Sequence, residues 1–113
     1  MIDRIAITLG DPAAIGPDIC VLMAKSHITR KHVLLTDPQL LLDSSKKLNI
    51  KININVLKTM TAKTLSGNNV LNVYPITLKA KNKPGYMSEK NASFVIETIK
   101  TAVKGCIDCL LYT

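Results

Sequence analysis

A short segment near the start of the chain joins an apolar strand to a helix through a turn rich in glycine and proline. Residues 5–19 read IAITLGDPAAIGPDI. Gly10 and Gly16 supply backbone freedom and allow another group to approach closely, and Pro17 suits the first turn of a helix. We therefore predict a buried strand over residues 5–9 and a well-covered helix over residues 17–25, a pairing typical of α/β folds.

The turn between them is a candidate ligand-binding loop. Free N–H groups at a strand-to-helix junction can hold an anion or a cofactor phosphate, so Gly10, Asp11, Pro12 and Gly16 are candidate cofactor-binding residues. Asp11 or Asp18 could also cap or charge the start of the helix. The spacing is not that of the G-x-G-x-x-G dinucleotide fingerprint. A purely structural turn explains the same residues, and both interpretations stay open.

The segment resembles the N-terminus of the 4-hydroxythreonine-4-phosphate dehydrogenases, in which a strand is followed by Gly-Asp-Pro-Ala-Gly-Ile-Gly-Pro-Glu. Ala14 stands where that family has glycine, and Asp18 stands where it usually has glutamate. If position 14 requires a positive φ, alanine carries a steric cost there. Residues 34–43 (LLTDPQLLLD) and 85–92 (GYMSEKNA) continue the resemblance, which covers nearly the whole chain.

This resemblance implies a three-layer α/β/α fold that is the N-terminal portion of a larger two-domain dehydrogenase, similar in architecture to the isocitrate and isopropylmalate dehydrogenases. It also implies a reaction of vitamin B6 biosynthesis. In that reaction NAD oxidises 4-phosphooxy-L-threonine, a small phosphorylated amino acid, and the product loses carbon dioxide to give 3-amino-2-oxopropyl phosphate. The implied cofactors are NAD and a divalent metal, Zn, Mg or Co, and the implied full-length enzyme is a homodimer.

The family's metal ligands and substrate-phosphate contacts come later in its chains, so no residue here is assigned a catalytic or metal-binding role. Residues 1–113 are expected to be an incomplete N-terminal α/β domain that is inactive alone. The helix before Gly105 is followed by an apolar run over residues 106–112, which predicts a further strand with no covering helix. Residues 109–113 are also what the adapter codons TGT-CTC-TTA-TAC-ACA encode. We expect an adapter-derived or truncated end there; a genuine short strand is the alternative.

The charge of the chain leaves a second functional class open. Fifteen Lys and Arg against eight Asp and Glu give a net charge of +7, which suits a small non-catalytic module that binds nucleic acid or another acidic partner. Thirteen of the fifteen are lysines spread along the chain, however, and arginine, which recognises phosphate in bidentate fashion, occurs only as Arg4 and Arg30. We therefore expect no nucleic-acid partner.

The cysteines and histidines indicate neither a disulfide framework nor a metal site. Cys20, Cys106 and Cys109 are odd in number, and the chain shows no secretory signal, so a cytoplasmic location is expected. A single C-x-x-C at 106 and 109 is weak evidence for zinc. His27 and His32 have no partner at ligand spacing. No apolar run is long enough to cross a membrane.

The rest of the pattern alternates strands with helices, which predicts a parallel or mixed sheet with helices on both faces. Strands are predicted over residues 32–35, 51–57 and 70–74, and helices begin at Asp37-Pro38 and near Ser88. Phe94 is a candidate core residue. The predicted inward-facing positions of these two helices are Leu40, Leu41, Leu42 and Leu48 in the first, and Val95, Ile96, Ile99, Ala102 and Val103 in the second.

Overall fold

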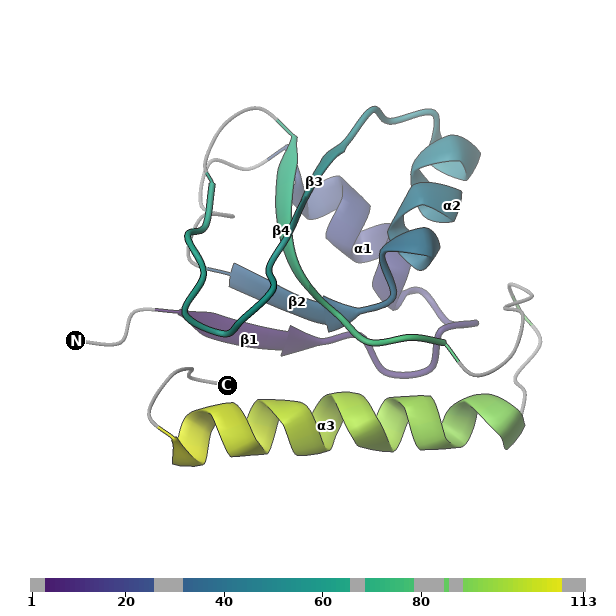
Figure 1. Cartoon of the computed structure of the whole chain (residues 1–113). Helices are drawn as coiled ribbons and strands as arrows, with labels where there is room; N and C mark the ends of the chain where they lie inside the picture. The colour runs from purple at the N-terminus through teal and green to yellow at the C-terminus, as the bar shows by residue number, and fades with distance from the viewer. Residues whose placement is uncertain (1–3, 26–31, 66–68, 79–84, 86–88, 109–113) are drawn as a thin grey trace.

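The computed structural model describes residues 4–25, 32–65, 69–78, 85 and 89–108. Four parallel strands form one sheet, and helices pack against it (Figure 1). The elements in chain order are β1 (Ile5–Thr8), α1 (Gly16–Met23), β2 (His32–Thr36), α2 (Pro38–Leu48), β3 (Asn53–Val56), β4 (Val70–Pro75), the 3-10 turn η2 (Glu89–Asn91) and α3 (Ala92–Ile107). The predicted α/β class and the alternation of strands and helices are confirmed.

The strand order is β1-β2-β4-β3, and every neighbouring pair is parallel. In the register, Leu34 lies opposite Ile7 on one side and Val73 on the other. The central strand β2 is buried from Val33 to Thr36, as expected for a parallel strand covered on both faces. The more exposed pattern of residues 51–57 fits the position of β3 at an edge.

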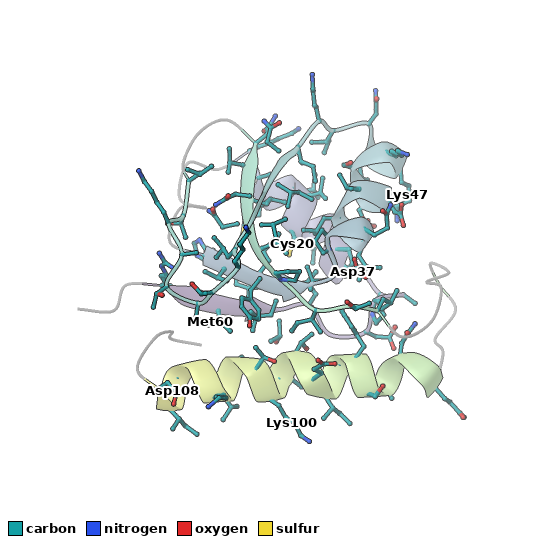
Figure 2. All side chains as sticks on the ribbon, in the orientation of Figure 1. Cys20, Asp37, Lys47, Met60, Lys100 and Asp108 are labelled. Atoms are coloured by element: carbon teal, nitrogen blue, oxygen red, sulfur yellow. The ribbon has the colours of Figure 1, made fainter. Side chains whose placement is uncertain are left out.

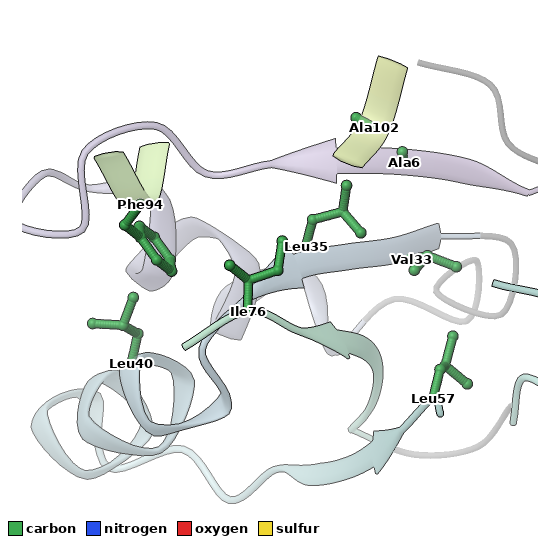
Figure 3. Close-up of a cluster of buried hydrophobic side chains, with 8 residues drawn as sticks. All are labelled: Ala6, Val33, Leu35, Leu40, Leu57, Ile76, Phe94 and Ala102. Atoms are coloured by element: carbon green, nitrogen blue, oxygen red, sulfur yellow. The ribbon is translucent and has the colours of Figure 1, made fainter. Parts of the chain in front are cut away.

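Successive residues of β2 point to opposite faces of the sheet and so belong to two separate cores. Leu34 packs with Cys20 and Val21 of α1 and Leu41 of α2. Val33 and Leu35 join a second cluster with Phe94 and Ala102 of α3, shown in Figure 3. Helices therefore cover both faces, which confirms the three-layer arrangement.

Asp37 connects the start of α2 with the chain that follows β4. Its Oδ1 accepts a hydrogen bond from the Gln39 backbone N–H at 3.0 Å, which caps the helix as Asp37-Pro38 predicted. Its Oδ2 accepts another from the Leu78 N–H at 2.9 Å. One carboxylate thus fixes two segments that lie forty-one positions apart in the sequence.

Replacing Asp37 with alanine is expected to destabilise the fold by about 1 to 2 kcal/mol, because it removes a cap and leaves the Leu78 N–H without this acceptor. Urea unfolding followed by circular dichroism measures this loss. Asp43→Ala is the matched control, since that exposed carboxylate bonds only the Gln39 side chain among the contacts described. Equal losses for the two variants would contradict the role assigned to Asp37.

Asn72 of β4 holds the segment after β3 against the sheet. Its side chain is buried, and its Oδ1 accepts from the Leu65 N–H at 2.9 Å while its Nδ2 donates to the Leu65 carbonyl at 3.0 Å. Asn55 Nδ2 also donates to Asn72 Oδ1, at 2.8 Å. These bonds satisfy a buried amide and order residues 57–65, which form neither a strand nor a helix.

The predicted buried face of α3 is only partly confirmed. Ala102 is buried and Val95 packs against the core, as predicted, but Ile96, Ile99 and Val103 are about half exposed. The other buried positions are Phe94, Thr98 and Gly105. Apolar residues occupy more than one face of this helix, and it approaches the sheet through Phe94 and its small residues. Its N-cap is Asn91, without a side-chain hydrogen bond to the helix, and Ser88 lies outside the described residues.

The other two helices are also less covered than predicted. Ile19 and Leu22 of α1 are half exposed, although Val21 is fully buried. In α2, Leu40 and Leu41 are buried as predicted, but Leu42 is exposed. Both helices pack against the sheet with a single narrow face, so their additional apolar residues remain outside the core.

The predicted strand beginning at Cys106 is wrong, because α3 continues through Gly105 and Cys106 to Ile107. Gly105 is buried within the helix, where glycine carries a modest cost in helix propensity. Lys104, in the last turn, forms an ion pair with Asp108 at 3.2 Å. Residues 109–113, with their expected adapter-derived or truncated end, lie outside the described residues.

Candidate functional site

The β1–α1 loop, residues 9–15, forms a tight turn that Asp11 stabilises. The Asp11 carboxylate accepts from the Ala13 N–H at 2.8 Å, and the Asp11 carbonyl accepts from the Ala14 N–H at 3.0 Å. Gly10 has a φ of +73°, a conformation that favours glycine. The Gly85 N–H donates to the Ala13 carbonyl at 3.0 Å, which ties the loop to a segment far along the chain.

Gly16 is required by the close approach of α1 to the end of β1. A Cβ atom at this position would lie 2.2 Å from the Leu9 carbonyl oxygen. The close approach expected of Gly16 is therefore confirmed, and Pro17 lies in the first turn of α1 as predicted. Among the described residues only Asn49 and Asn69 combine a side chain with a positive φ, so Ala14 carries no strain of that kind.

Neither aspartate caps α1. Its N-cap is Ile15, which makes no side-chain hydrogen bond to the helix. Asp11 bonds within the loop instead. Asp18 lies in the first turn of α1, where the helix dipole stabilises a negative charge.

A cavity of about 200 Å³ opens between this loop and α2. Its walls come from two parts of the chain, and its lining residues are Pro12, Ala14, Pro17, Asp18, Leu40, Asp43, Ser44 and Lys47. Of the four candidate cofactor-binding residues only Pro12 lines the cavity. Gly10, Asp11 and Gly16 instead set the conformation of the loop.

The wall contributed by α2 was not found from the sequence. Asp43 and Lys47 are four residues apart and so share a face of the helix, and Ser44 is buried beside them. The four-residue spacing was the one signal in the sequence for this wall of the cavity. The spacing places Asp43 and Lys47 on one face of α2, but it does not show that this face meets the β1–α1 loop. That contact depends on how α1 packs on α2.

The electrostatics of the cavity centre on an ion pair between the two helices. Lys47 Nζ lies 2.8 Å from Asp18 Oδ2, and Figure 2 shows Lys47 on α2. This ammonium holds the pKa of Asp18 below its ordinary value. Asp18 Oδ1 is buried and has no hydrogen-bond partner among the described residues. The Ser44 hydroxyl beside it also helps to lower the pKa of Asp18.

Replacing Lys47 with methionine is expected to raise the pKa of Asp18 and to destabilise the fold at neutral pH by less than about 1 kcal/mol, since the pair is partly exposed. The lowered pKa of Asp18 contributes stability that is present above its ordinary value of 3.8 and is lost as the pH falls through the lowered value. Unfolding titrations from pH 7 to pH 2 measure this. The exposed neighbour Lys46→Met should leave the acid limb of the profile unchanged; an identical profile for both variants would contradict the pairing.

The described residues contain no group of three or more His, Cys, Asp and Glu side chains that could hold a metal ion. His32 begins β2, as predicted, and His27 lies outside the described residues. Burial raises the pKa of the Cys20 thiol to about 11, so this cysteine is neutral at physiological pH. Cys106 is partly buried, and its C-x-x-C partner Cys109 is not described.

None of the described helices is both long enough and apolar enough to span a membrane. No family model matches the chain.

Curated proteins are similar to the chain in sequence. The chain is 40% identical over 103 residues to a 4-hydroxythreonine-4-phosphate dehydrogenase of Saccharophagus degradans, and the match covers 91% of this chain and 30% of that protein. It is 36% identical over 105 residues to that of Thioalkalivibrio sulfidiphilus, covering 93% and 32%.

Solved structures show the same fold. A crystal structure of the dehydrogenase of this name from Klebsiella pneumoniae superimposes with a TM-score of 0.83 at 19% identity, over 96% of this chain and 35% of that one. That from Burkholderia phymatum gives 0.84 at 17% identity, over 98% and 34%.

The chain spans about a third of the length of the curated relatives it matches. The comparisons give no support to the alternative of a small basic binding module. Over more than nine-tenths of its length, this chain is related in sequence and in fold to a segment of the 4-hydroxythreonine-4-phosphate dehydrogenases.

Proposed function

We propose that this chain forms the N-terminal part of an NAD-dependent dehydrogenase that oxidises 4-phosphooxy-L-threonine in vitamin B6 biosynthesis, with decarboxylation to 3-amino-2-oxopropyl phosphate. The observation that carries the proposal is the 40% identity to a dehydrogenase of this name over 91% of the chain. The closely packed Gly16 and the capped Asp37-Pro38 helix start, both in motifs shared with that family, add support.

In this proposal the β1–α1 loop contributes to a ligand site at the edge of the sheet where the parallel strands end. Ligands of open α/β sheets bind outside the carboxyl ends of the strands, and both this loop and Asp37 follow such ends. Gly10, Asp11, Pro12 and Gly16 would shape the loop backbone toward NAD, and the Asp18 carboxylate would accept a hydrogen bond from a hydroxyl group. Hydride acceptance is the chemistry that NAD supplies when bound.

The divalent metal does not fit the described residues, because they bring no three ligands together. We propose that its ligands, and those for the substrate phosphate, belong to the part of the dehydrogenase that this chain does not span. The metal's identity as Zn, Mg or Co, the homodimer and the cytoplasmic location belong to the same proposal.

The chain alone is expected to reduce no NAD above a no-protein control when given the phosphorylated substrate and a divalent metal. A chimera tests the proposal more directly, with the matching segment of the Saccharophagus degradans enzyme replaced by residues 1–108 of this chain. We expect this chimera to reduce NAD with a kcat within about tenfold of the parent, a barrier change of about 1.4 kcal/mol.

The same chimera carrying Gly16→Val serves as the control for a correctly packed loop and should lose activity. A folded chimera without Gly16→Val that shows no turnover would contradict the proposed function. Turnover by the chain alone would contradict the assignment of the missing ligands.

A further inference from the structure

The chain that follows β4 is bonded to the neighbouring strand at the edge of the sheet where the parallel strands end. The Ile76 N–H donates to the Thr36 carbonyl, at the end of β2, at 3.0 Å. The Leu78 N–H donates to the Asp37 carboxylate, directly after β2, at 2.9 Å. Because the strand order is β1-β2-β4-β3, these bonds direct the chain leaving β4 past β2 and toward β1.

Gly85 extends these contacts by one more strand. Its N–H donates to the Ala13 carbonyl at 3.0 Å, in the loop that follows β1. Figure 1 shows the β1–α1 loop beyond the ends of β1 and β2. The described backbone after β4 is therefore bonded to the end of β2 and then to the β1–α1 loop.

Ala13 is the residue at which the bond from Gly85 meets the internal hydrogen bonds of the loop. The Ala13 N–H donates to the Asp11 carboxylate at 2.8 Å, and the Ala14 N–H donates to the Asp11 carbonyl at 3.0 Å. The two backbone polar groups of Ala13 are thus both bonded, one inside the loop and one outside it. The bond from Gly85 joins the folded loop to another part of the chain.

The backbone conformation of Gly85 offers a way to test the bond. Its φ is +82°, and nothing lies within 4 Å of a Cβ built there, so a side chain meets no crowding. Asparagine adopts a positive φ more readily than most residues with a side chain, and it keeps the N–H donor. Proline lacks the N–H and has φ fixed at about −65°. Replacement by asparagine or by proline therefore separates the donor from the glycine itself.

We propose that Gly85 is a positioning residue of the dehydrogenase, whose N–H holds the β1–α1 loop in the conformation that receives NAD. This inference rests on the proposed function, in which that loop is the part of the cofactor site that this chain supplies. The ligands of the metal and of the substrate phosphate are assigned there to the part of the enzyme that this chain does not span. Loss of the Gly85–Ala13 bond should therefore weaken the binding of NAD and spare that of the substrate.

Amide hydrogen exchange in the chain alone tests whether Gly85 holds the loop. Gly85→Pro should speed the exchange of the Ala13 and Ala14 amides by at least about fivefold relative to the Leu34 amide of β2, and Gly85→Asn by less than about twofold. Unchanged exchange in the proline variant would overturn the inference. Equal acceleration in the two variants would also overturn it, because the effect would then not depend on the donor.

Steady-state kinetics of the chimera described above test the role in cofactor binding. We expect Gly85→Pro to raise the KM for NAD by about five- to tenfold, as for one lost hydrogen bond, with kcat and the KM for the phosphorylated substrate within about twofold. Gly85→Asn should behave like the unsubstituted chimera. Leu71→Val, a buried substitution near the start of β4, is the control for a general loss of stability and should change neither KM.

The outcomes separate this inference from the proposed function. An active chimera in which Gly85→Pro leaves the KM for NAD unchanged, or raises both KM values together, would overturn the inference and leave the proposed function standing. A folded but inactive unsubstituted chimera would refute the proposed function and with it the link to NAD. Exchange in the chain alone would then decide by itself whether Gly85 holds the loop.

Discussion

Replacing Gly16 with alanine is expected to destabilise the fold by about 3 kcal/mol. The added Cβ would lie 2.2 Å from the Leu9 carbonyl oxygen; Leu9 directly follows β1, and Gly16 is the first residue of α1. Relief requires α1 to move away from β1, which also loosens Cys20 and Val21 in the core beneath the helix. Urea unfolding followed by far-ultraviolet circular dichroism measures the change.

Gly10→Ala is the matched control for this experiment. Gly10 has a φ of +73°, but nothing lies within 4 Å of a Cβ built there. Its replacement therefore costs only the conformational penalty of an L-residue, about 1 to 2 kcal/mol. A larger loss at Gly10 than at Gly16 would show that loop conformation, rather than close packing, limits this turn.

Truncating Phe94 to alanine is expected to cost about 3 to 5 kcal/mol, because this side chain is 1% exposed and anchors α3 in the cluster with Leu35 and Ile76. Loss of α3 protection in hydrogen exchange should accompany the loss of stability. Ile96→Ala on the same helix is the control: Ile96 is 52% exposed, and its replacement should change the stability of the chain alone by less than about 1 kcal/mol.

This pair of variants distinguishes the two faces of α3. Were Ile96→Ala the more damaging substitution in the isolated chain, α3 would pack through Ile96, Ile99 and Val103, and these residues would be part of the core. The opposite result is expected here, because Phe94 and Ala102 both contact the sheet side.

Local chemistry made several elements predictable from the sequence. Asp37-Pro38 combines a side-chain acceptor with a fixed φ, so the start of α2 could be given to the residue. Gly16 and Pro17 similarly marked the entry to α1. In each case the signal lies within a few residues of the structure that it specifies.

The remaining features depend on packing between distant segments. The sequence of α3 offers Ile99 and Val103 as well as Phe94 and Ala102 for burial, and only the position of the helix over β1 and β2 decides between them. The cavity likewise needs α2 beside the β1–α1 loop, which no spacing within either segment encodes. Periodicity gives the number of apolar faces on a helix but not the layer that covers each one.

Asn72 has a consequence for which substitutions this chain can accept. Its amide exchanges two hydrogen bonds with the backbone of Leu65, just as one peptide group pairs with another across antiparallel strands. Because both bonds reach main-chain atoms, any residue type except proline, which lacks the N–H donor, can stand at position 65. Position 72 needs one donor and one acceptor on a short stem, which aspartate cannot supply when ionised and leucine lacks altogether. Natural variation should therefore be wide at 65 and narrow at 72, although the two residues form a single contact.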